Sequence, residues 1–280
     1  MAMDRQPRNW HAKTNVKPHK LGVLRIMPRF SANLGFLWTD LSLPRAIIAA
    51  HAAGFVAVEC HWPYETPPED VLSALDATGL PMLGLNTSRG DTAAGENGLS
   101  ALPDRETQAR AAIDQALEYA LAVGAKAVHV MAGNAQGPSA HATFVANLGY
   151  ACAQAAPSQI TILIEPLNRN DAPEYFLRNT DQAVVIMNEV NAENLKLMFD
   201  CYHVGRNEGD VITRFKALQT VIGHVQFAAV PDRGAPDHGE INYSHVFREL
   251  DAVGWAMPLG AEYKPGGPTE ATLGWMKTLV

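Results

Sequence analysis

The 280-residue sequence has few cysteines and no long hydrophobic run, and each absence excludes a class of protein. Its three cysteines, Cys60, Cys152 and Cys201, are odd in number and widely spaced. This argues against a disulfide framework and favours a reducing, cytoplasmic setting. No apolar run reaches the ~20 residues of a membrane span, and residues 1–26 lack the apolar core of a secretory signal. No G-x-G-x-x-G follows the first strand pattern, so nothing favours a dinucleotide-binding sheet.

Positive charge is also scarce, with 22 Lys and Arg against 29 Asp and Glu and a net charge of −7. This balance argues against nucleic acid as a partner, because phosphate binding needs a positive surface. Residues 1–26 are the exception, with six basic residues against Asp4 alone. We expect residues 1–26 to be a poorly ordered, non-catalytic tail and residues 27–280 to form one domain. A targeting segment, or sequence upstream of a start at Met27, are the alternatives for the tail.

Short apolar runs alternate with helical patterns from Arg29 onward, and no Gly/Ser or Pro-rich linker interrupts them. The runs predicted as strands are Arg29–Leu34, Phe55–Glu59, Pro81–Asn86, Ala125–Met131, Thr161–Glu165, Leu195–Asp200, Ile222–Phe227 and Met257–Glu262. Several are almost continuously apolar, as parallel strands buried on both faces are. The predicted helices are Leu43–Ala53, Arg105–Val123, Thr180–Val190, Asp210–Thr220, Tyr243–Val253 and Thr269–Leu279. Eight strands alternating with helices favour a single-domain (β/α)₈ TIM barrel of the α/β class.

Most of the predicted strands have a polar residue at the end or next to it, and in a barrel the carboxyl ends of the strands carry the function. These residues are Asn33, Glu59, Asn86, Glu165, Asp200, Gln226 and Glu262. The last four are separated by 35, 26 and 36 residues, about one strand-plus-helix unit each, so they can converge on one point. A single acid at a strand end is more often a helix cap or a surface group.

Three carboxylates and an amide oxygen form a ligand set that suits Mg²⁺ or Mn²⁺. Without a cation the three carboxylates would repel one another. We therefore predict one divalent metal ion held by Glu165, Asp200, Gln226 and Glu262.

Residues after these strands are candidates for substrate binding. His203, in a loop just past Asp200, either binds near the substrate and metal or is a solvated surface residue. The guanidinium fork of Arg233 is able to grip a carboxylate, with a salt-bridged surface arginine as the alternative. Glu240 either lines the same mouth or caps the next helix.

Weaker signals come from aromatic residues and from two further histidines. His129 is predicted to be a packed, hydrogen-bonded core histidine, and His224 a layer residue beneath the metal. Phe36, Trp38 and Trp62 either wall the pocket or pack the loops.

Several segments resemble one known family. They are Phe30-Ser-Ala-Asn33-Leu, Ala53-Gly-Phe-Val-Ala-Val-Glu59 with Pro63-Tyr64, Gly90-Asp-Thr-Ala-Ala-Gly-Glu96, Ile164-Glu-Pro-Leu-Asn168, Asp200-Cys-Tyr-His203, Gly223-His-Val-Gln226, and Gly239-Glu-Ile-Asn-Tyr243 with Glu262-Tyr-Lys-Pro265. Together they resemble the hydroxypyruvate isomerase family of xylose-isomerase-like barrels, which includes 2-oxo-tetronate isomerases. The likeness runs from about Met27 to the C-terminus.

The resemblance implies a barrel with the same four metal ligands, with Glu165 and Glu262 as the proton-transfer pair. It also implies that His203 and Arg233 contact substrate, and we expect Glu240, Asn33, Glu59 and Asn86 to line the same site. The sequence departs from the family pattern at Met198, where a Gln is common. It also departs at Val204-Gly-Arg206, where Met-Gln is typical, and at Ala235, where a Glu usually precedes the Pro. These changes are expected near the substrate, so they leave its identity open.

The chemistry implied is an aldose–ketose type isomerisation of a small sugar acid through an enediolate, with a carboxylate as base and another as acid. The substrate is hydroxypyruvate, giving tartronate semialdehyde, or a 2-oxo-tetronate. The alternatives are a ketose 3-epimerase acting on a neutral sugar and a metal-dependent DNA-repair endonuclease. The expected partner is a small-molecule acid, without nucleic acid or membrane, and assembly into a homo-oligomer stays open.

Overall fold

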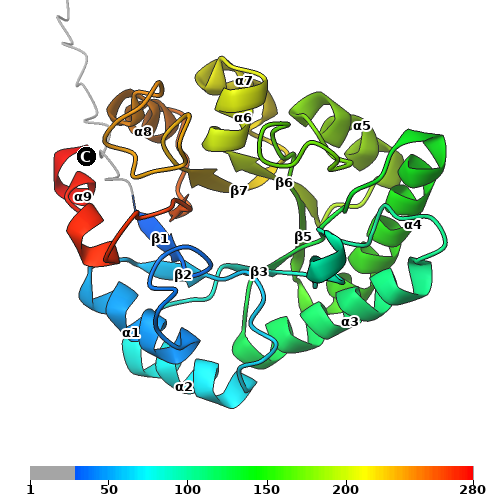
Figure 1. Ribbon diagram of the computed structural model, residues 1–280, viewed down its shortest axis with the longest axis horizontal. Coiled ribbons are helices and arrows are strands. Elements are labelled where there is room, and N and C mark those ends of the chain that lie inside the picture. Colours follow the sequence, from blue (N-terminus) through cyan, green and yellow to red (C-terminus); the bar gives the residue numbers. More distant parts are fainter. Residues whose placement is uncertain (1–28, 280) are drawn as a thin grey trace, which may run out of the picture.

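The computed structural model describes residues 29–279, in which eight parallel strands form a barrel surrounded by helices (Figure 1). The predicted tail, residues 1–26, lies outside the described residues. The strands are β1 (Phe30–Asn33), β2 (Ala57–Glu59), β3 (Gly84–Asn86), β4 (Ala127–His129), β5 (Thr161–Ile164), β6 (Leu195–Asp200), β7 (Ile222–Phe227) and β8 (Leu259–Ala261). Each lies within, or coincides with, its predicted run, so the predicted TIM barrel is confirmed.

The sheet runs in the order β2-β1-β8-β7-β6-β5-β4-β3, with every registered pair parallel. Between β2 and β3 the hydrogen-bond pattern is irregular, and a few backbone hydrogen bonds close the barrel there. The Leu83 amide donates to the Val58 carbonyl at 2.7 Å, and the Cys60 amide donates to the Gly84 carbonyl at 3.1 Å. The closure brings the carboxyl ends of all eight strands to one face of the molecule.

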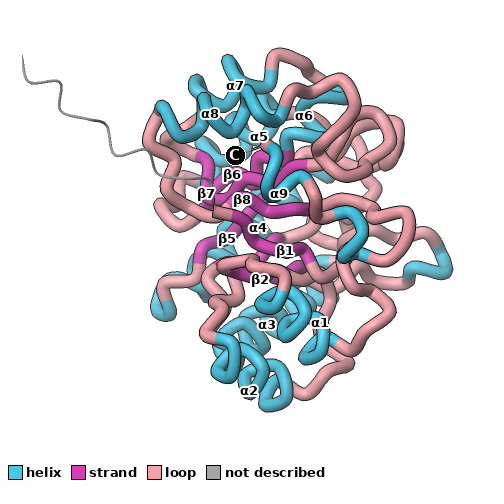
Figure 2. Tube along the Cα trace, turned by 90° about the vertical axis from the view of Figure 1, so that its left-hand side faces the viewer, coloured by secondary structure: helices cyan, strands magenta, loops and turns pink. Residues whose placement is uncertain are grey.

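Helices coat the outside of the barrel, as Figure 2 shows from the side. They are α1 (Leu43–Ala52), α2 (Pro68–Thr78), α3 (Glu106–Val123), α4 (Gly137–Ala155), α5 (Thr180–Val190), α6 (Cys201–Asn207), α7 (Val211–Leu218), α8 (Tyr243–Ala252) and α9 (Trp275–Thr278). Short 3₁₀ helices are η1 (Thr92–Ala94), η2 (Ala156–Ser158) and η3 (Thr269–Thr272). Within residues 29–279, no helix combines the length and apolar character that crossing a bilayer requires.

Local sequence signals set several helix ends. The side chain of Asn179 accepts a hydrogen bond from the Gln182 amide and so caps the start of α5. Helix α3 stops at Gly124, which has a φ of +69° and accepts the left-handed turn without the penalty of a side chain.

Three helices, α2, α4 and α6, were not predicted. The first two begin at Pro67-Pro68 and Gly137-Pro138, pairs that read as turns, although proline is well tolerated in the first turn of a helix. The predicted helix Thr269–Leu279 is wrong in the middle, because Leu273 and Gly274 separate η3 from α9.

Candidate active site

Four of the predicted residues come together where β5 to β8 end. Glu165 follows β5, Asp200 ends β6, Gln226 lies in β7 and Glu262 follows β8; all four are buried. These strands are neighbours in the sheet, and Asp200 pairs in register with Gln226. Strand register alone therefore gathers three carboxylates and an amide at one point above the barrel.

One group of side chains in this cluster has the geometry of a candidate metal site. Donor atoms of Glu165, Asp200 and His203 all lie within 4.8 Å of one another. His203 Nε2 is 3.7 Å from Asp200 Oδ2 and 3.9 Å from Glu165 Oε1.

Several acceptor atoms in the cluster have no hydrogen-bond partner among the described residues. They are Glu165 Oε1, Asp200 Oδ2 and Gln226 Oε1. Buried polar atoms in proteins are nearly always paired, so three bare oxygens in one place fit a cation as their missing partner. Hard oxygen ligands suit Mg²⁺ or Mn²⁺, and the residues present therefore fit the predicted ion.

The electrostatics of the two acids with bare oxygens point the same way. Burial, followed by the charge of Glu262, raises the pKa of Asp200 to about 7. Burial and the charges of Glu262 and Asp200 raise the pKa of Glu165 well above its usual value. Positive charge at the cluster would relieve this repulsion.

Glu262 differs from these acids because donors surround it. Its Oε1 accepts from Asn33 Nδ2 at 2.9 Å, from His61 Nε2 at 3.0 Å and from Gln226 Nε2 at 3.3 Å. Its Oε2 accepts from the Arg233 guanidinium. Burial alone would raise the pKa of Glu262, but the charge of Arg233 and the His61 contact outweigh it and lower the pKa to about 2. Glu262 is therefore ionised while Glu165 resists ionisation, the pattern of an acid–base pair.

Arg233 lies inside the site and is not a surface arginine. Its guanidinium is 3.8 Å from Asp200 Oδ2 and lies between the rings of Phe36, 4.7 Å away, and Tyr202, 5.0 Å away. Its Nε is buried without a partner among the described residues. One edge of the guanidinium thus has an unpaired donor.

His203 lies in helix α6, so its predicted position in a loop is wrong. The short helix begins directly after Asp200, whose side chain caps it by accepting from the Tyr202 amide. The backbone amide of Asn168 donates to His203 Nδ1 at 2.9 Å. Burial lowers the pKa of His203 to about 3, so the ring is neutral and its one proton is on Nε2. His203 therefore presents an N–H to the cluster.

His129 is buried in the barrel, as predicted, but the prediction that it is hydrogen-bonded is wrong. Neither ring nitrogen has a partner among the described residues, and Nδ1 is 3.6 Å from Glu165 Oε2. Burial lowers the pKa of His129 to about 4. The ring adjoins a cavity of about 80 Å³ that runs beneath the cluster, large enough for a few water molecules.

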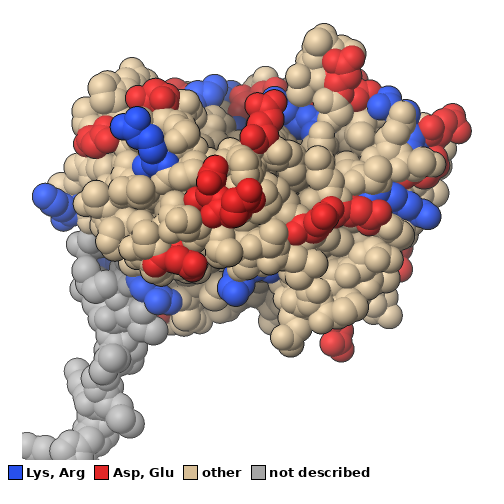
Figure 3. Space-filling model, turned by 90° about the horizontal axis from the view of Figure 1, so that it is seen from below, with Lys and Arg blue, Asp and Glu red and all other residues tan. Residues whose placement is uncertain are grey.

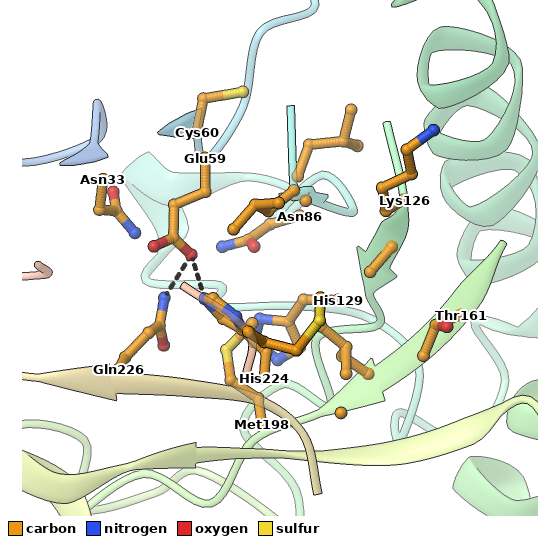
Figure 4. A pocket seen from close by; sticks show the side chains of 17 residues that line it. Asn33, Glu59, Cys60, Asn86, Lys126, His129, Thr161, Met198, His224 and Gln226 are labelled. Atoms are coloured by element: carbon orange, nitrogen blue, oxygen red, sulfur yellow. Dashed lines mark hydrogen bonds and ion pairs between the residues drawn. The ribbon is translucent and has the colours of Figure 1, made fainter. Parts of the chain in front are cut away.

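Figure 4 shows the side chains that line this cavity, with a hydrogen-bonded group among them. Glu59 Oε2 accepts from His224 Nε2 at 2.8 Å and from Gln226 Nε2 at 3.0 Å. His224 is buried in the barrel interior opposite Met198, where the sequence analysis placed a layer residue. Met198 also lines the cavity and so lies below the cluster.

The other predicted residues differ in their distance from the cluster. Asn33 contacts Glu262, and Asn86 lines the cavity half-buried. Glu240 is exposed in an outer groove with Asp210 and His245, and the cap of α8 is Asn242, so the structure does not bring Glu240 to the cluster.

The three aromatic residues that follow β1 and β2 also differ in whether they line the site. Phe36 walls the site beside Arg233. The guanidinium of Arg89 lies over the ring of Trp62, 4.0 Å from the ring centre. The indole N–H of Trp38 donates a hydrogen bond to Glu270 and so packs the loops.

His61 is a site residue that was not predicted. It lies two residues beyond Glu59, a spacing that keeps side chains on the same side of an extended chain, and this was the available signal. Its ring packs edge-to-face on Phe36, with the ring centres 5.3 Å apart. A Cβ at Gly35 would lie 2.1 Å from His61 Nδ1, so the absence of a side chain there makes room for the ring.

Comparison with known proteins gives consistent similarities. Residues 47–279 match the family described as xylose isomerase-like TIM barrel. A 2-oxo-tetronate isomerase of Cupriavidus necator is 45% identical over 255 residues, covering 90% of this chain and 98% of the relative. A hydroxypyruvate isomerase of Escherichia coli is 37% identical, covering 89% and 98%. A crystal structure named as a family 2 AP endonuclease from Brucella melitensis superimposes with a TM-score of 0.87 at 37% identity, covering 90% and 99%.

Proposed function

This chain belongs to the xylose isomerase-like TIM barrel family, as a sugar-acid isomerase of the hydroxypyruvate and 2-oxo-tetronate isomerase group, and we propose that its substrate is a 2-oxo-tetronate. The listed relatives with that name are 37–45% identical, and two of them reach 45% and 42%, whereas those named hydroxypyruvate isomerase or putative hydroxypyruvate isomerase are 36–38% identical. Hydroxypyruvate, one carbon shorter, is the second candidate.

The proposed reaction moves a carbonyl from C2 of the acid to C3. A proton leaves C3, negative charge spreads over the oxygens of an enediolate, and a proton arrives at C2. The hydroxyl proton passes from the oxygen on C3 to the oxygen on C2, so atoms and electrons balance within the substrate. Glu262 and Glu165 are proposed as the proton-transfer pair. Glu262 carries this proposal, because Arg233 and His61 hold it unprotonated in a buried place. Its basicity would rise when a substrate carboxylate shares the charge of Arg233.

The proposed metal ligands are Glu165, Asp200, Gln226 and Glu262, and the bound ion would supply positive charge for the substrate oxygens. We assign His203 to the substrate because its Nε2 carries a proton while the Asn168 amide occupies Nδ1. This N–H is proposed to donate to a substrate oxygen on which charge develops.

Arg233 is proposed to bind the substrate carboxylate. Its side chain is only 14% exposed, and its Nε has no partner among the described residues. A guanidinium fork matches a carboxylate with two parallel hydrogen bonds. This feature favours an acid over the neutral ketose of a 3-epimerase. Four solved epimerases with a similar barrel are 16–19% identical to this chain and show the fold alone.

The endonuclease alternative has less support. The formal net charge is −7, and on the face shown in Figure 3 acidic and basic side chains are interspersed. A DNA-binding face would need clustered positive charge.

The test is incubation of the Mn²⁺- or Mg²⁺-loaded protein in D₂O with 2-oxo-tetronate, hydroxypyruvate and neutral four- and six-carbon ketoses. NMR shows which compound gains deuterium and at which carbon. We expect deuterium at C2 of the product from 2-oxo-tetronate. Exchange confined to neutral ketoses would contradict the proposal.

A further inference from the structure

The orientation of the Gln226 amide decides whether this side chain is able to bind a cation. Its oxygen is a ligand for a metal ion, whereas its NH₂ group would direct protons at the ion. We propose that Glu59, fixed by His224, is a positioning residue that turns the oxygen of Gln226 toward the metal cluster. This inference rests on the metal ligands in the proposed function and assigns Glu59 a role other than substrate contact.

The contacts of the Gln226 amide favour one orientation. Its Nε2 donates to Glu59 Oε2 at 3.0 Å and to Glu262 Oε1 at 3.3 Å. In the opposite orientation Oε1 would face these two carboxylate oxygens, acceptor against acceptor, in a place where Gln226 is only 2% exposed. The hydrogen bonds would be lost and repulsion would replace them. The observed orientation leaves Oε1 without a partner among the described residues, as Glu165 Oε1 and Asp200 Oδ2 also are, and Gln226 pairs in register with Asp200.

Glu59 is itself held in place from two sides. His224 Nε2 donates to Oε2 at 2.8 Å, and Ser31 Oγ donates to Oε1 at 3.2 Å. Glu59 is 3% exposed. The contacts with His224 and Ser31 therefore fix the carboxylate that Gln226 faces.

Gly260 of β8 is part of the same arrangement. A Cβ at this position would lie 2.2 Å from Glu59 Oε1, 2.8 Å from Gln226 Cγ and 3.0 Å from His224 Nε2. The side chains of Glu59, Gln226 and His224 thus lie against the backbone of residue 260, where there is no room for a Cβ atom. A residue at 260 larger than glycine would displace Glu59, and with it the partner of Gln226.

The test is a double-mutant cycle on Mn²⁺ affinity, measured by electron paramagnetic resonance without substrate. Glu59→Met removes the acceptor and should weaken Mn²⁺ binding 10–100-fold, as loss of a partner that orients a ligand typically does. Glu59→Gln keeps an acceptor for His224 and Gln226 while its NH₂ faces Ser31, so its affinity should stay within about threefold of wild type. Ser31→Ala is the matched control, because it removes only the bond to the far oxygen of Glu59.

The background Gln226→Met separates positioning from direct charge. If Glu59 acts through the amide, adding Glu59→Met to Gln226→Met changes the Mn²⁺ affinity little. An undiminished loss in that background, or equal losses for Glu59→Gln and Glu59→Met, would mean that the charge of Glu59 attracts the ion directly and would overturn the inference. Unchanged affinity in Glu59→Met would overturn it as well.

Two further outcomes are distinguishable. If Glu59→Met does not fold, as judged by circular dichroism, His224→Leu tests the same arrangement by releasing Glu59 Oε2, and a wild-type affinity there would refute the inference. If wild-type protein binds Mn²⁺ and the cycle shows coupling but no 2-oxo acid is isomerised, the substrate assignment fails while the positioning role stands. If wild-type protein binds no Mn²⁺, the metal site and this inference both fail.

Discussion

Replacement of Arg233 tests whether the substrate is an acid. The substitution is Arg233→Met, which removes the charge and keeps a long side chain. Arg233 has a φ of +60°, and methionine bears the same backbone cost there as arginine, so folding is affected little by the backbone. Arg233→Lys is the control, because it keeps the charge but lacks the planar fork.

The expected magnitude follows from the position of the guanidinium. A cation about 4 Å from a carboxylate contributes about 4 kcal/mol at an effective dielectric constant of about 20. This corresponds to roughly a thousandfold in affinity, and competition from Glu262, which already binds the same guanidinium, reduces it. We expect Arg233→Met to raise the KM for 2-oxo-tetronate by about 10²–10³-fold, and Arg233→Lys to raise it less.

The assay compares an acid with a neutral ligand. Steady-state kinetics give the KM for 2-oxo-tetronate, and inhibition of the same reaction gives the inhibition constant of a neutral four-carbon ketose. Arg233 also contacts Glu262, so kcat is expected to fall for any substrate. The ratio of the KM for the acid to the inhibition constant of the neutral ketose cancels any effect on the site that both compounds share. Equal increases in both constants, or an unchanged KM for the acid, would refute the role of Arg233 in binding a carboxylate.

Three further predictions concern the acids, a buried histidine and the metal. Glu262→Gln should lower kcat by about 10²–10⁴-fold, and unchanged turnover with Mn²⁺ still bound would contradict its proposed role in proton transfer. Burial lowers the pKa of His129 to about 4 from a usual value of 6.5. Below pH 6.5 this histidine therefore binds a proton in the unfolded chain but stays neutral in the folded protein. The free energy of unfolding of the metal-free protein should therefore fall between pH 6.5 and pH 4, by at most about 3 kcal/mol from this residue, and urea titrations should show a smaller fall in His129→Gln. Treatment with EDTA should abolish isomerisation and lower Tm, and Mn²⁺ or Mg²⁺ should restore both; an unaffected Tm and activity would argue against the metal.

The strands were predictable because their physics is local. Parallel strands buried on both faces need continuous apolar runs, and segments such as Leu195–Asp200 and Ile222–Phe227 meet that need over their whole length. The convergence of Glu165, Asp200, Gln226 and Glu262 followed from the repeat of the fold, since each lies within one residue of the end of its own strand. Their function as metal ligands stays a prediction.

Other features depend on contacts between distant parts of the chain, and the sequence carries little sign of them. The proton position on His203 is set by the amide of Asn168, 35 residues earlier in the chain. The inward position of Arg233 depends on Phe36 and Tyr202, which belong to other loops and helices. Glu240 shows the converse case, because it follows β7 in a polar loop and yet is exposed in an outer groove.

The close contact between Gly35 and His61 constrains the order in which this site could have changed over time. A side chain at position 35 would occupy the space of the imidazole, so His61 holds Glu262 only in a chain that already has glycine there. If glycine arises at position 35 first, a histidine that arises later at position 61 has room for its ring. If histidine arises first, its ring is displaced from Glu262 until position 35 becomes glycine. Positions 35 and 61 should therefore vary together among related chains. A chain with alanine at 35 should carry a smaller or differently directed residue at 61.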